Sequence, residues 1–347
     1  MIKAIIFILI IVCGYFIPFK RLYSFLVLVS LVILNYISPN VADVAAYEGV
    51  YNFIGNEGNQ YLNTGYGWWL LCKIGNKLQL NYLSFKTVIL IFSFSLVLYS
   101  LKRLNIKNNM LIATYLIYPA ITDLIQIRFF LGTSIVIYLL TFLIKANFRS
   151  YIIYIGGIVL ITSQIHTGTY FYLLLALWQV FFKYKEISCV LSIIGGIILT
   201  IDKRLIVLLV TYFGTDQESN FYLNTGYYAS AKLKILFIVT TLLFLFFSYY
   251  IYKTINKKEL EMWEMNYLKL TVFGNYISIF LIILSAFAFT FLRLQKPMWI
   301  LNYIQIAIYT KYGTKGRLSP QVLWIVYGLL AAIWLIGTEE IALKDFF

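Results

Sequence analysis

The sequence predicts an all-α protein that crosses a membrane many times, and its composition carries that prediction. Hydrophobic residues make up 61% of the 347 residues and charged residues only 12%, about half of the roughly 25% usual in soluble domains. The mean hydropathy is +0.83. Polar residues are too few to cover a water-soluble globule of this size. The composition therefore excludes a soluble enzyme, a nucleic-acid-binding module and a disordered scaffold.

Apolar segments able to cross a bilayer occur along the whole chain, beginning at its N-terminus. A span needs about 20 mainly apolar residues, or fewer where neighbouring helices shelter its ends. We predict about 12 transmembrane helices, at 2–17, 22–37, 83–101, 110–122, 129–145, 151–165, 168–182, 187–200, 232–252, 268–291, 297–311 and 321–336. They would form one transmembrane domain over residues 1–347, with two long outer loops at about 38–82 and 201–231.

The first long loop contains an amphipathic stretch at residues 67–81. Lys73 and Lys77 are four residues apart and share one helix face, while Trp68 and Trp69 begin the stretch. A short helix with a basic face and an apolar face lies along the membrane surface rather than across it. We therefore expect a short interfacial helix here.

The net charge of +14 follows the predicted topology. Alternate short connections hold more than half of the 28 basic residues. These basic residues are Lys20, Arg21, Lys102, Arg103, Lys107, Lys145, Arg149, Lys183, Lys185, Lys253, Lys257, Lys258, Lys269, Lys311, Lys315 and Arg317. Because Lys and Arg accumulate in cytoplasmic loops, these connections are predicted to be cytoplasmic, with both termini outside. The basicity then needs no nucleic acid as a partner.

Motifs for metal, nucleotide or covalent chemistry are missing from the sequence. Cys13, Cys72 and Cys189 are odd in number and show neither metal-ligand spacing nor a disulfide framework. There is no Walker loop, dinucleotide fingerprint or serine-nucleophile elbow. An Asp-x-Asp pair for a metal-bound nucleotide sugar is also absent. We expect no metal and no cofactor, and a glycosyltransferase of this sequence would use a different kind of donor.

Three basic side chains are placed at the outer ends of predicted spans: Arg128, His166 and Arg293. Charges at bilayer depth are costly and tend to mark function, and Arg suits bidentate contact with phosphate. Each also has an ordinary explanation, since an Arg at a helix end can reach the headgroups and a His can bond a carbonyl. Because they share one membrane level, we predict that they converge on an anion.

Outer-side polar and aromatic residues are the candidates for substrate binding. The octamer at 59–66 recurs at 220–227 and differs only at Gln60 and Phe221. The repeat indicates either a shared Asn-Thr-Gly turn or two tyrosine-bearing loops that frame a sugar-binding cavity. The predicted substrate-binding residues are Asp43, Tyr47, Glu48, Tyr66, Gln126, Lys296 and Tyr227.

These residues occur in an order that resembles a known family. The relevant elements are Asp43-x-x-x-Tyr47, Gly65-Tyr66-x-x-x-Leu70-Leu71, Ile127-Arg128, Ile165-His166-Thr167-Gly168 and Arg293 before a tyrosine-containing segment. The order resembles the EpsG family of Wzy-type polymerases, which make bacterial exopolysaccharide, capsule and O-antigen. The family often has Ile-Arg-Gln where this chain has Phe129 after Arg128.

The resemblance implies a glycosyltransferase on the outer face of the bacterial cytoplasmic membrane. Such enzymes transfer a growing glycan from undecaprenyl diphosphate to a lipid-linked repeat unit, alongside a flippase and a chain-length regulator. Arg128 and Arg293 would then hold the diphosphate. His166 would be the proton acceptor, with Asp43 or Glu48 as alternatives, or would itself bind the diphosphate. An O-antigen ligase ranks second and a lipid-linked oligosaccharide flippase third, because a flippase should show mid-bilayer charges and a two-fold repeat.

Overall fold

The computed structural model describes residues 2–17, 21–37, 42–56, 65–184, 230–284, 289–312 and 318–338, with isolated positions at 187–194 and 343–346. Within these ranges the chain is helical and forms no β-sheet, which confirms the all-α prediction. It divides into two compact units. Unit 1 comprises Met1–Thr141, Val159–His166 and Trp324–Phe347, and unit 2 comprises Phe142–Ile158 and Thr167–Leu323. The single transmembrane domain stays a prediction.

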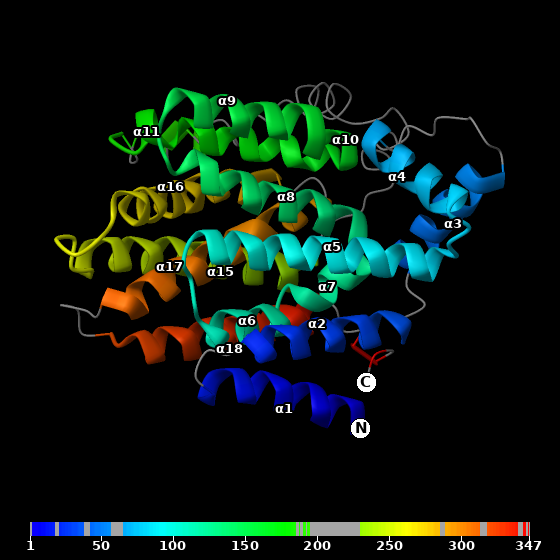
Figure 1. The fold of residues 1–347 in the computed structure, drawn as a ribbon. Helices are drawn as coiled ribbons and strands as arrows, with labels where there is room; N and C mark the ends of the chain where they lie inside the picture. The colour runs from blue at the N-terminus through cyan, green and yellow to red at the C-terminus, as the bar shows by residue number, and fades with distance from the viewer. Residues whose placement is uncertain are drawn as a thin grey trace. The chain divides into compact units, whose positions relative to one another are not determined.

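The helices of each unit are drawn in Figure 1. Unit 1 holds α1 (Ile2–Phe16), α2 (Arg21–Tyr36), α3 (Ala42–Asn56), α4 (Tyr66–Lys77), α5 (Tyr82–Arg103), α6 (Asn109–Ile117), α7 (Ala120–Ile125), α10 (Ser163–Ile165), and most of α8 (Ile127–Leu143) and α18 (Pro320–Thr338). Unit 2 holds α9 (Phe148–Gly157), the 3₁₀ helices η2 (Thr167–Leu177) and η3 (Phe289–Gln295), α11 (Trp178–Phe181), α15 (Ala231–Thr254), α16 (Met262–Leu284) and α17 (Lys296–Tyr312). The π-helical turn η1 (Ile158–Thr162) joins α9 to α10.

Four helical segments are long and apolar enough to cross a membrane: Tyr82–Arg103, Phe148–Ile165, Ala231–Thr254 and Pro320–Thr338. Four shorter apolar segments, Lys3–Phe16, Arg21–Tyr36, Ile127–Leu143 and Thr167–Phe181, match further predicted spans. The described helices thus fit an integral membrane protein, while the number of about 12 spans stays a prediction. Most of the predicted span 187–200 and most of the loop 201–231 lie outside the described residues.

The predicted span 110–122 is not one continuous helix. It is divided between α6 and α7, with Tyr118 extended at φ −157° and Pro119 after it. Proline supplies no N–H for a helical hydrogen bond and pushes the preceding residue out of the helical region. The break makes α7 a separate short helix, and only Gln126 lies between α7 and α8.

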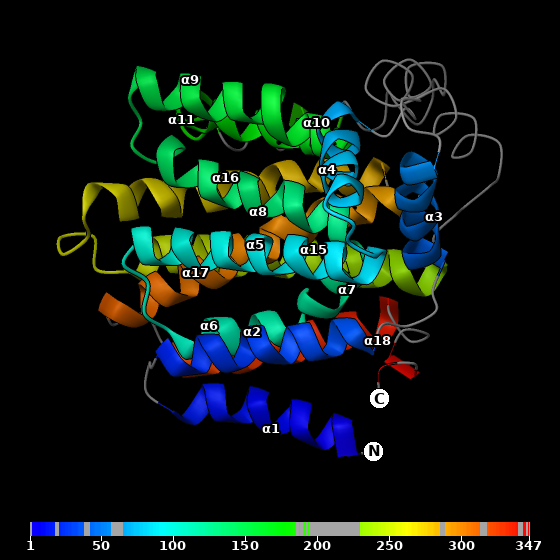
Figure 2. The ribbon, with the colours of Figure 1, turned by 45° about the vertical axis from the view of Figure 1, so that its right-hand side comes forward.

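Unit 1 has two ends, which both ribbon views separate clearly. The start of α1, the helices α3, α4 and α10, and the end of α18 lie at one end, whereas α2 and α6 begin at the other (Figures 1 and 2). Hydrogen bonds fix this packing: Tyr23 Oη donates to the Ile10 carbonyl at 3.0 Å, and Asn109 Nδ2 donates to the Ile17 carbonyl at 3.2 Å. The alternation of these helices between the two sides of a membrane stays a prediction.

The first long loop contains two helices, α3 and α4. Within the amphipathic stretch, α4 buries Trp68 and Cys72, while Lys77 is exposed. Lys73 Nζ lies 4.8 Å from the ring centroid of Trp69. A helix of 12 residues is too short to cross a bilayer. The predicted helix is therefore present, and its position along the membrane surface stays a prediction.

Polar side chains connect the long helices of unit 2. Asn275 of α16 and Asn302 of α17 exchange two hydrogen bonds of 3.0 Å, and both residues are fully buried. Gln305 Nε2 donates to the Ser248 carbonyl of α15 at 3.0 Å. Between apolar helices such bonds stabilise association, because an unpaired polar group would be stranded in hydrocarbon. They fix the register of α15, α16 and α17.

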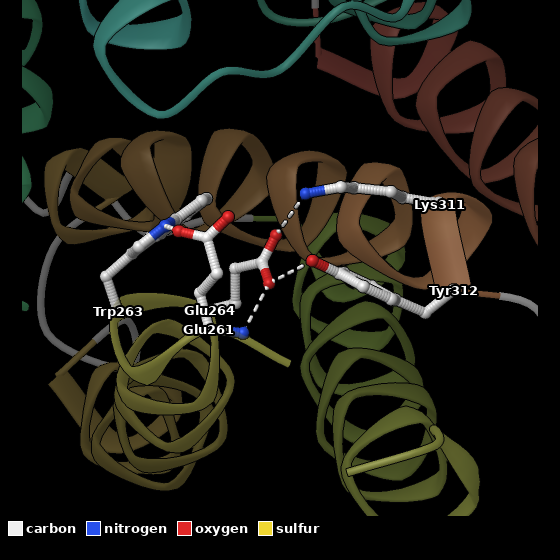
Figure 3. A network of polar contacts seen from close by, with 5 residues as sticks. All are labelled: Glu261, Trp263, Glu264, Lys311 and Tyr312. Carbon is white, nitrogen blue, oxygen red and sulfur yellow. Dashed lines mark hydrogen bonds and ion pairs between the residues drawn. The ribbon is translucent and has the colours of Figure 1, made fainter. Parts of the chain in front are cut away.

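A buried carboxylate joins the first turn of α16 to the end of α17 (Figure 3). Glu264 accepts hydrogen bonds from the Glu261 backbone N–H at 2.9 Å, from Lys311 Nζ at 2.9 Å and from Tyr312 Oη at 2.5 Å. The bond to the Glu261 N–H is one half of a capping box. Burial, followed by the bond to Glu264, raises the pKa of the Tyr312 phenol, so it remains a donor.

We expect Glu264→Gln to destabilise the protein. The amide loses the charge that strengthens all three hydrogen bonds and offers a donor where an acceptor is needed. The expected loss of unfolding free energy is about 1–3 kcal/mol, measured as a lower melting temperature of the purified protein in detergent. Glu261→Gln is the matched control, since Glu261 is exposed and an amide can still accept from Trp263 Nε1. Equal melting temperatures would contradict the role of Glu264.

Candidate functional site

Arg128 lies at the start of α8, and its side chain is tied to a segment that follows much later in the chain. Its Nε donates a 2.6 Å hydrogen bond to the carbonyl oxygen of Ile165, the last residue of α10. Arg128 is 8% exposed. A buried guanidinium must satisfy its donors, and a carbonyl at a helix C-terminus is a natural acceptor because it lacks a helical partner. The bond uses only one of the five N–H donors of the side chain.

His166 directly follows the carbonyl that Arg128 contacts. Its backbone is extended, at φ −149°, and its ring packs edge-on against Phe129 with centroids 4.8 Å apart. Phe129 is also the residue after Arg128. Each of the two predicted catalytic residues therefore lies against the sequence neighbour of the other, so the fold brings Arg128 and His166 together.

The beginning of α4 lies against the same segment. Gly65 has φ +91°, a conformation that side-chain-bearing residues rarely adopt. A Cβ at Gly65 would collide with the Gln164 carbonyl oxygen and would lie 3.6 Å from Arg128 Nη2. The glycine thus allows the first turn of α4 to approach α10 and the guanidinium closely. The glycine of the Gly65-Tyr66 motif therefore has a structural role, which is to let α4 begin in close contact with α10.

Gln126 connects this region to α3. Its Nε2 donates a 3.4 Å hydrogen bond to Asp43 Oδ2 in the first turn of α3. Gln126 is buried, and its Oε1 has no hydrogen-bond partner among the described residues. Two of the predicted substrate-binding residues, distant in sequence, are therefore in contact.

The remaining first-loop candidates lie on α3 and α4. The ring of Tyr47 meets the buried ring of Trp68 edge-on at 6.2 Å, and Glu48 is exposed. Tyr66 is 55% exposed and stacks on Trp69 at 5.6 Å. Tyr66 is the exposed ring of this pair and Trp69 is half-buried. The Tyr66 ring offers a flat face of the kind on which apolar sugar surfaces pack.

Cys72 on α4 is the thiol of this region, and its environment argues against nucleophilic chemistry. Burial raises the pKa of the Cys72 thiol to about 12, although the positive charge of Arg128 acts in the opposite direction. The nucleophile in cysteine chemistry is the thiolate. At neutral pH Cys72 therefore remains a protonated, packed side chain.

Arg293 and Lys296 belong to unit 2. Arg293 lies in η3, where Tyr172 Oη donates to the Leu294 carbonyl at 2.9 Å and Gln295 Nε2 donates to Thr241 Oγ1 at 2.8 Å. Lys296 is buried at the start of α17. Tyr227 lies outside the described residues. A shared site that includes Arg293 and Lys296 as well as Arg128 stays a prediction.

Two buried charged residues of unit 1 were not among the predicted site residues. Lys86 on α5 is 1% exposed. Asp123 on α7 accepts a 3.0 Å hydrogen bond from Tyr115 Oη on α6. The sequence signal for both was a charged residue in or next to an apolar segment, which is a functional hint in a membrane protein.

The described helices are those of an integral membrane protein, in which the segments of Arg128 and His166 are in contact and Gln126 is bonded to Asp43 of α3. The chain belongs to the EpsG family, whose family model matches residues 20–344. The match confirms the resemblance drawn from the sequence and supports a role in polysaccharide biosynthesis as a glycosyltransferase-like polymerase. No curated protein and no solved structure matches the chain.

We expect Gly65→Ala to loosen the contact between α4 and α10. The methyl group meets the Gln164 carbonyl and strains the backbone at positive φ. In a background with Cys13 and Cys189 changed to Ser, buried Cys72 reports this loosening through its rate of maleimide labelling. We expect an increase of about tenfold or more, since roughly 1.4 kcal/mol of local destabilisation raises the open population tenfold.

Gly49→Ala on α3 is the matched control for this experiment. No atom lies within 4 Å of a Cβ at Gly49, and alanine favours helix more than glycine does. Its labelling rate should equal that of the parent protein. An unchanged rate in Gly65→Ala would show that the close approach of α4 does not depend on this glycine.

Proposed function

We propose that the protein is a polysaccharide polymerase of the EpsG family that acts on lipid-linked glycans. It transfers a growing chain from undecaprenyl diphosphate to a lipid-linked oligosaccharide repeat unit, on the outer face of the bacterial cytoplasmic membrane. The observation that carries the proposal is the family match over residues 20–344. The contact between the Arg128 and His166 segments within unit 1 supports it, because this chemistry needs a cation and a proton acceptor near each other.

Arg128 binds the diphosphate leaving group in this proposal. Its Nε is held by the Ile165 carbonyl, so the guanidinium is oriented before substrate arrives and little entropy is lost on binding. When the glycosidic bond to the phosphate breaks, negative charge grows on the departing oxygen. A preoriented guanidinium stabilises that charge in the transition state, which is the largest single effect in many such sites. Arg293 of unit 2 contributes a second cation.

His166 accepts the proton of the attacking acceptor hydroxyl. Imidazole has a reference pKa close to operating pH, which suits a general base. The edge-on contact with Phe129 restricts the ring orientation and leaves a half-buried side chain at the end of α10. The acceptor glycan packs on the Tyr66 and Trp69 pair, and the flippase and chain-length regulator act before and beside this step.

The first test is glycan length in the native host after deletion of the gene. Deletion should leave single lipid-bound repeat units, and the wild-type gene should restore a ladder. Arg128→Ala and His166→Ala should fail to restore it while remaining inserted in the membrane. Arg128→Lys should also fail, because lysine keeps the charge but loses the planar fork that bonds a carbonyl and a phosphate together.

Arg103→Ala is the matched arginine control. Arg103 lies at the end of α5, where its Nη1 reaches Tyr138 Oη at 3.5 Å, so this variant should restore the ladder. Long chains that stay on the carrier lipid after deletion would instead identify a ligase. Repeat units trapped on the cytoplasmic leaflet would identify a flippase and refute the polymerase.

The role of His166 has a separate test. His166→Gln keeps a hydrogen-bonding group but removes the base, so we expect the rate of chain growth by purified protein on a lipid-linked repeat unit to fall about 10²–10⁴-fold. Asp43→Asn and Glu48→Gln should retain activity. If His166→Gln retains activity and one of the two acidic variants loses it, the general base is that carboxylate and not His166.

A further inference from the structure

Five aromatic side chains connect α3, α4 and α5 at one end of unit 1, where both views show the three helices together (Figures 1 and 2). We call Tyr47, Tyr51, Trp68, Tyr82 and Phe85 the aromatic junction. Tyr51 stacks on Phe85 at 4.7 Å and lies 5.8 Å from Tyr82. Trp68 meets Phe85 at 5.7 Å and Tyr47 at 6.2 Å.

The polar atoms of the aromatic junction differ in whether they have a hydrogen-bond partner. Tyr51 Oη donates a 2.6 Å hydrogen bond to the Leu80 carbonyl, so it has a structural partner. Tyr82 Oη and Trp68 Nε1 are buried and have no hydrogen-bond partner in the part of the chain that the structure describes. Buried donors are normally paired, and each exception needs an explanation.

Lys86 places a buried positive charge on α5, the helix that carries Tyr82 and Phe85. It follows Phe85 on α5, lies one helical turn after Tyr82 and is 1% exposed. The carboxylate of Glu48 on α3, which is exposed, acts electrostatically on both Lys86 and Tyr82. An ammonium and an indole N–H can only donate hydrogen bonds, and a phenol donates readily. Tyr82 Oη and Trp68 Nε1 are therefore donors without an acceptor among the described residues, and an acceptor with negative charge would complement them.

We propose that Lys86, Tyr82 and Trp68 form an oxyanion subsite of the substrate-binding region in unit 1, beside the Arg128 contacts made by α4. The proposal deepens the function proposed above and rests on it. Two parts of a lipid-linked glycan carry such an anion: the diphosphate of the carrier, and the carboxylate of an acidic sugar. Both offer acceptor-only oxygens to the same three donors.

Binding to the purified full-length protein in detergent tests the subsite, with inorganic pyrophosphate and sodium D-glucuronate as separate probes in titration calorimetry. Lys86→Met and Tyr82→Phe should each weaken binding of one probe about tenfold or more, the loss expected for a hydrogen bond to a charged group. Weaker pyrophosphate binding would identify the diphosphate as the natural ligand, and weaker glucuronate binding would identify an acidic sugar.

Tyr51→Phe is the matched control, because it removes a hydroxyl from the same aromatic junction. It deletes a satisfied hydrogen bond to Leu80, so it should lower the melting temperature and leave binding unchanged. Tyr82→Phe should weaken binding and leave the melting temperature unchanged, because the Tyr82 hydroxyl has no hydrogen-bond partner to lose within the described structure. This opposite pattern separates a ligand site from a packing role.

Two results would overturn the subsite. One is that neither probe binds the wild-type protein. The other is that both probes bind Lys86→Met and Tyr82→Phe as tightly as wild type. The proposed function fails separately, if gene deletion leaves the glycan ladder intact. In that case, pyrophosphate binding that depends on Lys86 would still establish an anion site. If instead the Lys86→Met strain makes an intact ladder and the purified variant binds both probes as wild type does, the subsite alone is refuted.

Discussion

The hydrogen bond from Arg128 Nε to the Ile165 carbonyl is the constraint on which this end of unit 1 depends. A buried guanidinium needs acceptors, and the C-terminus of α10 supplies one that no helical N–H uses. The bond sets the start of α8 against the end of α10 and therefore sets His166 beside Phe129. Gly65 then allows α4 to begin against the same carbonyl segment. A structural contact thus orients the guanidinium that we propose binds the diphosphate.

Sequence patterns predicted the residues of this region better than their contacts. Arg128 and His166 were candidates because charges at span ends are costly, and the α4 helix followed from the spacing of Lys73 and Lys77. The contact between Gln126 and Asp43 was not predictable, because it joins helices that are distant in the chain and depends on tertiary packing. Lys86 was visible as a lysine in an apolar span, but three of the five rings of the aromatic junction come from two other helices, α3 and α4.

The boundaries of helices were harder to predict than their existence. Hydropathy measures how apolar a segment is and does not register where the backbone must turn, so the segment 110–122 was expected to be one span. Pro119 divides it and releases α7 as a separate turn. A second interruption at Gln126, with φ −103° and ψ 55°, separates α7 from α8, and the Gln126 side chain donates a hydrogen bond to Asp43 of α3.

Buried donors without partners are not in themselves specific, since Trp178 of unit 2 also has a buried indole N–H without a partner among the described residues. The aromatic junction differs because two such donors, from Trp68 and Tyr82, belong to one packed cluster. Buried Lys86 follows one of its rings, Phe85, on α5. In unit 2 the polar side chains Asn275 and Asn302 bond each other, as expected where polarity serves helix association. Side chains that serve packing satisfy one another, whereas side chains that serve a ligand retain unused donors in the free protein. The donor-rich junction at α3, α4 and α5 fits the second description.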